Sequence, residues 1–407
     1  MVGLARALVA CRSETPPGDT RAVADEAARL IADVPAVEIE RYPSAPHIAN
    51  LVIRVRGRGP GRRLVFNGHM DTFPLVDAAR WTADPAGEER GGRLYGLGVS
   101  DMKGGLAAIL FALGHLARHR EGWAGEVAAT FVGDEETMGE LGSQFLLDTV
   151  PHAKADAMIS ADAGSPRVLR FGEKGMIWLS MHARGRSAHA AHVHLGDSAI
   201  DRLLAAIGEL RRLQDYPIAA PQLVLQAIDV ASPLSEPLSG AGESDVLKSI
   251  TVTISMIHGG RLPNLVADTA EARVDIRLPV GVTVAEVETE IARLVAFHQG
   301  VELKIHRRCE PSWTLPDHEI VRLLANNCTA VLGAVPAKNM RCGASDARLY
   351  RRAGIPSVVC GLTPHNMGCA DEYVDIDELV ALGKILALTA FDYLGGQTDD
   401  MPSSPAS

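Results

Sequence analysis

The sequence of 407 residues lacks any apolar run near the roughly 18 residues that a membrane-spanning helix requires. It also lacks an excess of basic residues, since 40 Lys and Arg face 50 Asp and Glu, for a net charge of −10. Nucleic acids and anionic membrane surfaces attract positively charged proteins. We therefore expect neither a nucleic acid nor a membrane as a partner.

Cysteine is sparse, and aromatic residues make up only 4% of the chain. The six cysteines are scattered and form no CxxC pair, which argues against a cysteine zinc site and against a disulfide framework. Leu8 to Cys11 resembles a lipoprotein cleavage box, but its apolar stretch is short and Arg6 interrupts it. We expect a cytoplasmic protein with reduced thiols.

The chain is too long for one ordinary hydrophobic core, which predicts two domains. Near the beginning of the chain, strand-like apolar runs alternate with helical patterns. Helices are expected at 21–32 and 104–119, and strands at 49–56, 64–67 and 126–136. This alternation predicts an α/β fold with a doubly wound, mostly parallel sheet. In such sheets ligands bind at the carboxyl ends of the strands.

The middle of the chain reads as a strand, a helix, two strands, a helix and a strand. This βαββαβ order predicts an inserted α+β domain at 176–307, between catalytic segments 1–175 and 308–394. Within the insertion, the Pro/Gly/Ser-rich segment 217–244 is expected to be a long loop. Residues 395–407 are expected to form a disordered tail.

Acidic and histidine residues recur at the predicted strand ends or just after them. In "FNGHMDTFP", positions i and i+2 of a strand point to one face, so His69 and Asp71 share a side. The other motif residues follow later strands or precede a helix: Asp101, Glu135, Glu136, Asp162 and His365. Each alone has an ordinary explanation, such as a helix cap, a solvated charge, a turn residue or a loop histidine.

Taken together at one rim, these carboxylates would repel one another unless cations lay among them. Histidine and carboxylate ligands suit zinc, manganese or cobalt. Five such ligands, one of them shared, could hold two ions about 3.5–4 Å apart. The sequence therefore predicts two divalent ions, with zinc expected and cobalt or manganese as alternatives.

These motifs resemble the dinuclear-zinc deacylases and exopeptidases, which include succinyl-diaminopimelate desuccinylase, acetylornithine deacetylase, aminoacylase and the glutamate carboxypeptidases. The resemblance extends in the same order from "TPPGDT" to "DEYV". It implies that His69 and Asp162 bind one metal, Glu136 and His365 the other, and that Asp101 bridges both. It further implies that Asp71 orients the His69 ring and that Glu135 is the general base.

The inserted segment resembles the lid or dimerisation domain of that family. The resemblance implies that His189 stabilises the oxyanion, from the partner subunit in a homodimer, with His192 and His194 as loop residues. Asn264 and Arg277 match positions that contact substrate, and an arginine fork suits a carboxylate, although a strand-surface charge is the other interpretation of Arg277. Weaker candidates for substrate contacts come from "GASDAR": Gly343 and Ser345.

The sequence departs from this family at three positions. Leu97 replaces an arginine that many relatives carry, and His365 lies further from Glu372 than in several relatives. Asp162 stands where desuccinylases have glutamate and many peptidases have aspartate, which slightly favours a peptide-like substrate.

The predicted function is metal-dependent hydrolysis of the amide bond of a small N-acyl amino acid or dipeptide bearing a carboxylate. A metal-bridging hydroxide would attack, with Glu135 as general base. A hydrolytic deaminase or an N-carbamoyl amidohydrolase on the same site is the alternative, and a non-catalytic metal-binding homologue is a further one. A serine hydrolase is not favoured, because no GxSxG motif occurs.

Overall fold

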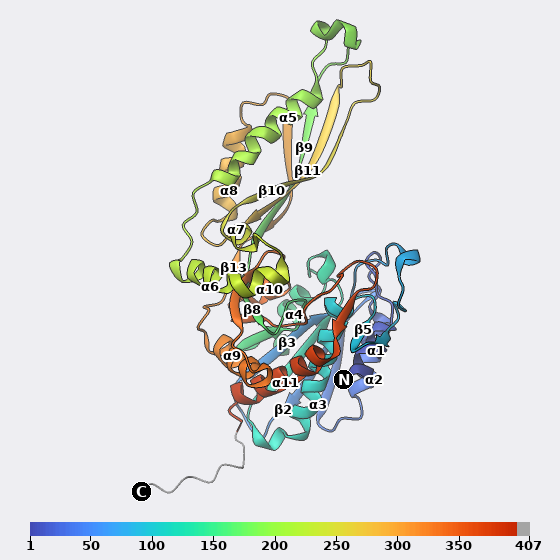
Figure 1. Ribbon diagram of the computed structural model, residues 1–407, viewed down its shortest axis with the longest axis vertical. Helices are drawn as coiled ribbons and strands as arrows, with labels where there is room; N and C mark the ends of the chain where they lie inside the picture. The colour runs from blue at the N-terminus through green and yellow to red at the C-terminus, as the bar shows by residue number, and fades with distance from the viewer. Residues whose placement is uncertain (397–407) are drawn as a thin grey trace. The chain divides into compact units, whose positions relative to one another are not determined.

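The computed structural model describes residues 1–396 and divides into two compact units. The first unit contains residues 1–171, 314–339 and the chain from 345 onward, and the second contains 172–313 and 340–344 (Figure 1). The sequence places the inserted domain at 176–307, whereas the contacts group 172–175, 308–313 and 340–344 with it as well. The predicted tail lies outside the described residues from position 397 onward.

A nine-stranded sheet, most of whose strands belong to the first unit, has the order β1-β2-β6-β3-β7-β15-β8-β13, with β14 paired to β8, and β13 falls among the residues grouped with the second unit. Strands β6, β3, β7 and β15 run parallel to one another. On one side β2 pairs antiparallel with β6 and β1 with β2, and on the other side β8 pairs antiparallel with β15 and β13 with β8. The predicted α/β class with a parallel sheet centre is confirmed. The strands are β1 (Val37–Ala45), β2 (Ile48–Arg56), β3 (Arg63–His69), β6 (Glu126–Val132), β7 (Ala157–Ser160), β8 (Val168–Glu173), β13 (Ser312–Trp313), β14 (Ala337–Arg341) and β15 (Ser357–Val359).

Helices cover both faces of this sheet. Successive side chains of β3 point to opposite faces, and the two faces contact different helices. Val65 packs in one cluster with Tyr350 of α10, whereas Gly68, on the other face, lies against Leu106 of α3. Helix α11 packs on both α3 and α9. The helices of this unit are α1 (Val2–Val9), α2 (Arg21–Ile31), α3 (Gly104–Arg118), α4 (Ser143–Thr149), α9 (Glu319–Leu332), α10 (Ala347–Arg352) and α11 (Ile376–Tyr393).

The remaining elements of the first unit are short. A three-stranded sheet has the order β16-β5-β4, from β4 (Glu88–Arg90), β5 (Arg93–Tyr95) and β16 (Tyr373–Asp375). Short helical turns connect the larger elements, and they are η1 (Ala78–Arg80), η2 (Val99–Lys103), η3 (Arg120–Gly122), η4 (Glu135–Thr137) and η5 (Pro151–Ala153).

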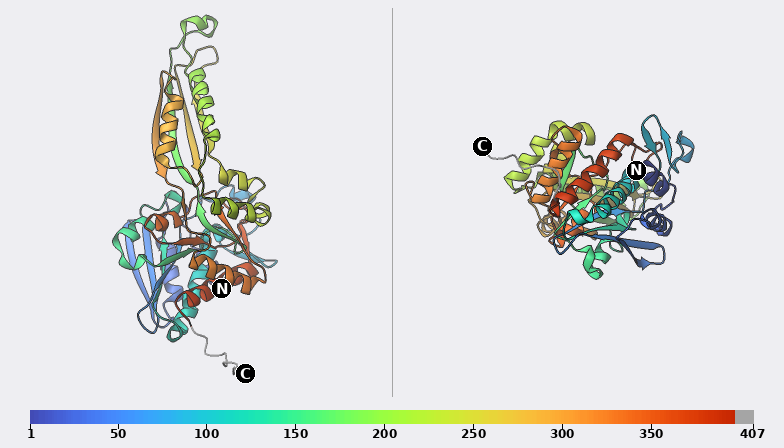
Figure 2. Two further views of the ribbon diagram at one scale, coloured as in Figure 1. Left: turned by 90° about the vertical axis from the view of Figure 1, so that its left-hand side faces the viewer. Right: turned by 90° about the horizontal axis from the view of Figure 1, so that it is seen from below.

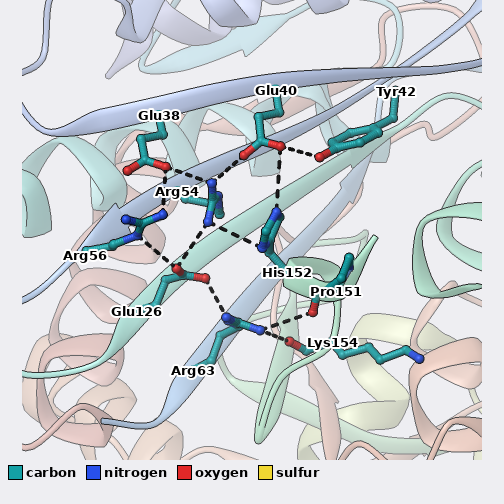
Figure 3. Close-up of polar contacts among 10 residues, drawn as sticks. All are labelled: Glu38, Glu40, Tyr42, Arg54, Arg56, Arg63, Glu126, Pro151, His152 and Lys154. Atoms are coloured by element: carbon teal, nitrogen blue, oxygen red, sulfur yellow. Dashed lines mark hydrogen bonds and ion pairs between the residues drawn. The ribbon is translucent and has the colours of Figure 1, made fainter. Parts of the chain in front are cut away.

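A network of ion pairs links residues at the amino ends of β3 and β6 (Figure 3). The Arg54 side chain is only 8% exposed and contacts the carboxylates of Glu38, Glu40 and Glu126. Arg63, the first residue of β3, donates to Glu126, the first residue of β6, at 2.7 Å. Because these residues begin the parallel strands, the network lies at the end of the sheet opposite the carboxyl ends.

The second unit contains a four-stranded antiparallel sheet in the order β10-β11-β9-β12. Helices α5 and α8 lie side by side on one face of it (Figures 1 and 2). The odd-numbered residues of β9, from Ile177 to Ala183, are buried in the core beneath these helices. The predicted βαββαβ elements are β9 (Gly175–Arg184), α5 (Ala199–Leu210), β10 (Thr251–Gly259), β11 (Thr269–Leu278), α8 (Val284–Val295) and β12 (Val301–Cys309).

The long loop predicted at 217–244 is wrong, because this segment contains an 18-residue helix, α6 (Gln222–Ser239), followed by α7 (Glu243–Lys248). Its buried residues, Val224, Ile228, Ala231 and Ser235, recur every three or four positions, which is the period of a helix. Pro233 and Pro237 lie inside the helix and are exposed. The two prolines favoured a loop in the sequence analysis, so the helical spacing of the buried residues was not recognised.

The second unit also contains two short helical turns, η6 (Ala190–Leu195) and η7 (Arg211–Asp215).

Among residues 1–396, none of the helices is both long enough and apolar enough to cross a membrane.

Candidate metal centre and active site

Three neighbouring parallel strands bring the predicted motifs to one rim. His69 is the last residue of β3 and pairs in register with Val132, the last residue of β6. On the other side of β3, Asn67 is in register with Ser160, which ends β7. The residues after these strand ends, including Glu135, Glu136 and Asp162, therefore begin at the same edge of the sheet.

Asp101 reaches this rim from a different element. It lies in the segment η2 that precedes α3, and its Oδ1 atom is 2.9 Å from Nε2 of His69. In the described residues, ligand atoms gather within 4.8 Å of one another in two groups, and His69 belongs to both. One group is His69, Glu135 and Glu136, and the other is His69, Asp101 and Asp162.

Asp71 contacts both the histidine and the two glutamates. Its backbone carbonyl lies 2.9 Å from Nδ1 of His69, and its Oδ1 atom lies 3.6 Å from the same nitrogen. Its fully buried carboxylate accepts hydrogen bonds from the backbone N–H groups of Glu135, at 3.2 Å, and Glu136, at 3.0 Å. Asp71 therefore fixes the turn that carries the two glutamates as well as approaching the His69 ring.

The electrostatics of the rim favour a cation. Burial, and then the nearby Asp162, raise the pKa of Glu135 well above its usual value, and burial raises the pKa of Glu136 to about 8. Burial alone would lower the pKa of His69, but Asp101 and Asp71 raise it well above normal. In the described part of the chain, Oε1 of Glu136 is buried without a hydrogen-bond partner. A divalent ion would satisfy this oxygen and offset the repulsion between carboxylates, so these residues fit a metal.

His365 joins neither group. Its ring stacks on Tyr373 with centroids 4.4 Å apart and an interplanar angle of 4°. Its Nε2 atom lies 3.8 Å from Oδ2 of Asp375, and its backbone carbonyl accepts from the Tyr373 N–H at 3.2 Å. The structure thus places the fifth predicted ligand against β16.

In the second unit, the structure brings two predicted residues together. The segment at His189 forms an antiparallel bridge with Leu265, and the Ala190 N–H donates to the carbonyl of Asn264 at 2.9 Å. His189 is exposed, and its Nδ1 atom accepts from the Ala191 N–H at 3.2 Å. A neutral ring in this contact carries its proton on Nε2.

The remaining predicted substrate residues lie in different settings. Arg277 on β11 donates twice to Asp275, at 2.8 and 2.9 Å. Ser345 is fully buried, and its hydroxyl accepts from the Ala347 N–H at 3.3 Å, at the start of α10. Gly343 is exposed.

Comparison with known proteins places the chain in a family. The model of peptidase family M20/M25/M40 matches residues 65–392. The chain belongs to this family. Succinyl-diaminopimelate desuccinylase from Methylorubrum populi is 31% identical to this M20 chain over 405 residues, covering 95% of the chain and 97% of the relative. The same enzyme from Rhodospirillum centenum is 29% identical over 395 residues, covering 94% and 95%.

A solved M20 metallo-carboxypeptidase from Sulfolobus solfataricus has a TM-score of 0.80 to this chain at 17% identity, covering 95% of this chain and 97% of the other. Its similarity supports the fold. Membership in the M20 family confirms the resemblance found in the motifs and the prediction of a metal-dependent hydrolase of amide bonds.

The sequence analysis of this M20 chain did not select the buried residues around the turn that carries Glu135 and Glu136. The Arg348 side chain is 4% exposed and donates to the carbonyls of Met138, at 2.8 Å, and Ser345. Asp346 accepts from the hydroxyl of Ser143 at 2.7 Å. Burial, and then the charge of Asp346, raise the pKa of Asp134 to about 7. The sequence "SDAR" was the available signal, because it places Asp346 one residue and Arg348 three residues after Ser345.

Glu372 is a second residue that the predicted site did not include. Its carboxylate is 1% exposed and accepts from the N–H groups of Gly98, at 3.0 Å, and Ser100, at 2.9 Å. These contacts anchor the segment that leads into Asp101.

Proposed function

We propose that this protein hydrolyses the amide bond of a small N-acyl amino acid or dipeptide, with Glu135 as general base. The observation that carries this proposal is the grouping of Glu135 with His69 and Glu136 within 4.8 Å. A proton acceptor beside a metal site is an arrangement that suits metal-assisted hydrolysis of an amide.

His69, Asp101, Glu136 and Asp162 are the proposed ligands for divalent ions, with zinc as the proposed metal and cobalt or manganese as alternatives. When bound, such an ion polarises the scissile carbonyl and lowers the pKa of nearby water toward about 7. His365, the fifth predicted ligand, would have to leave the Tyr373 ring to join this set. Asp71 keeps the His69 ring and the glutamate turn in place.

Glu135 would take a proton from the attacking water and deliver it to the nitrogen of the leaving amine. Its partial burial beside other carboxylates keeps its affinity for a proton high, which suits both steps. The proton on Nε2 of His189 would donate to the oxyanion of the tetrahedral intermediate.

Asn264 and Arg277 are proposed to contact the substrate, with Arg277 binding its carboxylate. A substrate carboxylate would replace Asp275, which now occupies the arginine fork. Gly343 and Ser345 remain weaker proposals, because the Ser345 hydroxyl already caps the start of α10. The names of the curated relatives make N-succinyl amino acids the first class to test.

We also propose a homodimer formed through the second unit and a cytoplasmic location. Strand β10 is an edge strand with exposed Met256 and Ile257, at 53% and 50%, so it offers a free strand edge to a second copy. The scattered thiols support a reducing compartment.

A substrate panel tests this proposal. Metal-loaded protein would be assayed against N-acetyl and N-succinyl amino acids, dipeptides, N-carbamoyl amino acids and aminoarenes, with chelator-treated protein as control. Turnover of an acylated amino acid or dipeptide that chelation abolishes supports it. Turnover of only the carbamoyl compounds or aminoarenes would support the alternative reaction, and no metal-dependent turnover of any amide would contradict hydrolysis at this site.

A further inference from the structure

A cavity of about 150 Å³ lies beside the C-terminal end of α1 in the first unit. Most of its lining is apolar and comes from segments that are well separated in the sequence: Val9, Ala10, Leu75, Pro85, Ala86 and Leu97. The Leu97 N–H donates to the carbonyl of Pro85 at 2.9 Å, which joins two of these segments. The cavity is partly open, and its walls at Ala10 and Ala86 are exposed to solvent.

One charged residue of the lining is almost completely buried. Lys103 is 2% exposed, and its ammonium group donates to the carbonyl of Cys11 at 2.5 Å. A lysine ammonium group carries three N–H donors. Among residues 1–396, the Cys11 carbonyl is its one hydrogen-bond partner, and no carboxylate oxygen lies within 4.0 Å of its nitrogen. Two donors of a buried cation therefore remain for a ligand.

The carboxylate that lines the cavity is bound to a different cation. The Oε1 atom of Glu14 accepts from Nε of Arg12 at 2.8 Å and lies 2.5 Å from Nη2 of the same side chain. The charges of Arg12 and Glu14 thus offset each other, and Lys103 supplies the net charge of the lining. Because buried charges in proteins are normally paired, the cavity suits an anion.

The size and lining of the cavity restrict the class of anion. An apolar cavity of about 150 Å³ holds a molecule the size of benzene, which has about six non-hydrogen atoms. One ammonium group offsets a single negative charge, so a doubly charged anion would leave one charge unpaired against apolar walls. A short aliphatic monocarboxylate meets both conditions, because its alkyl chain is apolar and its charge is single.

We propose that this cavity binds a small aliphatic monocarboxylate, whose carboxylate accepts hydrogen bonds from Lys103 and whose alkyl chain packs against Leu75 and Leu97. The lining contains none of the proposed metal ligands and not the proposed base. The site is therefore separate from the metal centre, and its existence does not depend on the proposed function.

Titration of the metal-loaded, full-length protein with butyrate tests the proposal. Calorimetry would compare butyrate with butyramide, which has the same size and no charge, and with butylamine, whose charge is opposite. We expect one equivalent of butyrate to bind, about tenfold or more tighter than either of the others, because hydrogen bonds between charged groups are the strong ones.

Two variants test the cation and the cavity separately. Lys103→Met removes the charge, and Ala86→Leu fills the cavity from its exposed wall while keeping Lys103. Each should weaken butyrate binding by about tenfold or more. The exposed controls Lys154→Met and Ala79→Leu should change it by no more than about threefold. If Lys103→Met folds poorly, Ala86→Leu and the comparison with butyramide decide the outcome.

Carboxylates also bind metal ions, so the titrations would be repeated after chelator treatment. Binding that survives chelation and is lost in Ala86→Leu supports the cavity site. Binding that chelation abolishes and Ala86→Leu retains would place butyrate at the metal centre and overturn the proposal. Equal affinity for butyrate and butyramide, or no binding of butyrate to the wild type, would overturn it as well.

Discussion

The carboxylate of Asp71 accepts a hydrogen bond from the backbone N–H of Glu136 at 3.0 Å. The other oxygen of the same carboxylate accepts from the N–H of Glu135 at 3.2 Å. One buried side chain thus holds the end of β3 and the turn after β6 in a fixed relation. The proposed base and the proposed metal ligands depend on this relation for their spacing.

Asp71→Asn should lower kcat/KM by roughly 10–100-fold, because an amide can accept only one of the two hydrogen bonds and presents N–H to the other donor. Steady-state kinetics and metal titration measure the effect. The exposed Asp77→Asn is the matched control. Unchanged kinetics in Asp71→Asn would show that the turn keeps its geometry without this contact.

Glu135→Ala should retain bound metal and lose on the order of 10²–10⁴ in kcat, the usual contribution of a general base. The comparison variant is Glu140→Ala, an exposed glutamate near the same turn. Elemental analysis of the bound metal distinguishes loss of the general base from loss of a metal ion. Near-normal turnover by Glu135→Ala would remove this residue from the proposed role.

Arg348→Met should destabilise the first unit by about 3 kcal/mol and reduce turnover, because it leaves buried oxygen atoms unsatisfied beneath the glutamate turn. Chemical unfolding and kcat would be measured beside Arg352→Met, an exposed arginine of the same helix. A loss of stability with full activity would mean that the turn does not rely on Arg348.

Mixing His189→Ala protein with Glu135→Ala protein tests whether His189 acts across a dimer. After random exchange of subunits, half of the dimers are hybrids with one complete site, so about a quarter of wild-type activity should return. Native mass spectrometry checks the exchange. If exchanged subunits stay inactive, His189 acts within its own chain.

Arg54→Met should lower the free energy of unfolding by about 3–5 kcal/mol, because it leaves the carboxylates of Glu126 and Glu40 without their buried partner. Arg56→Met, whose side chain is 58% exposed, is the control and should cost far less. Equal losses in the two variants would contradict a special role for the buried arginine.

The same network predicts a loss of stability in acid. The hydroxyl of Tyr42, and then Arg54, hold the pKa of Glu40 below its usual value. A depressed pKa in the folded state stabilises it above the unfolded pKa of about 4.3, and this contribution disappears as the pH falls through the folded value. Unfolding measured from pH 6 to pH 3 should show this loss in the wild type and less of it in Glu40→Gln.

The sequence predicted the parallel strands well because β3, β6 and β7 are short, apolar and buried runs. It missed β1, an edge strand whose residues are mostly polar and only partly buried. It missed α6 because Pro233 and Pro237 suggested a loop, although a buried stripe at helical spacing was present.

For the site, strand periodicity and motif order were enough to select His69, Asp101, Glu136 and Asp162, which the structure gathers at one rim. They could not show which way a side chain in a loop turns, as the stacking of His365 on Tyr373 illustrates. They also could not reveal Arg348 or Glu372, whose partners are backbone groups far away in the chain.

The rim where β6, β3 and β7 end has a consequence for folding. The proposed ligands His69, Glu136 and Asp162 lie at the ends of separate strands or just after them, and they meet only when those strands pair in register. A captured ion would therefore act as a cross-link that reports completed assembly of the sheet centre. On heating, its escape would mark the moment when these three strands part, even if helices elsewhere persist.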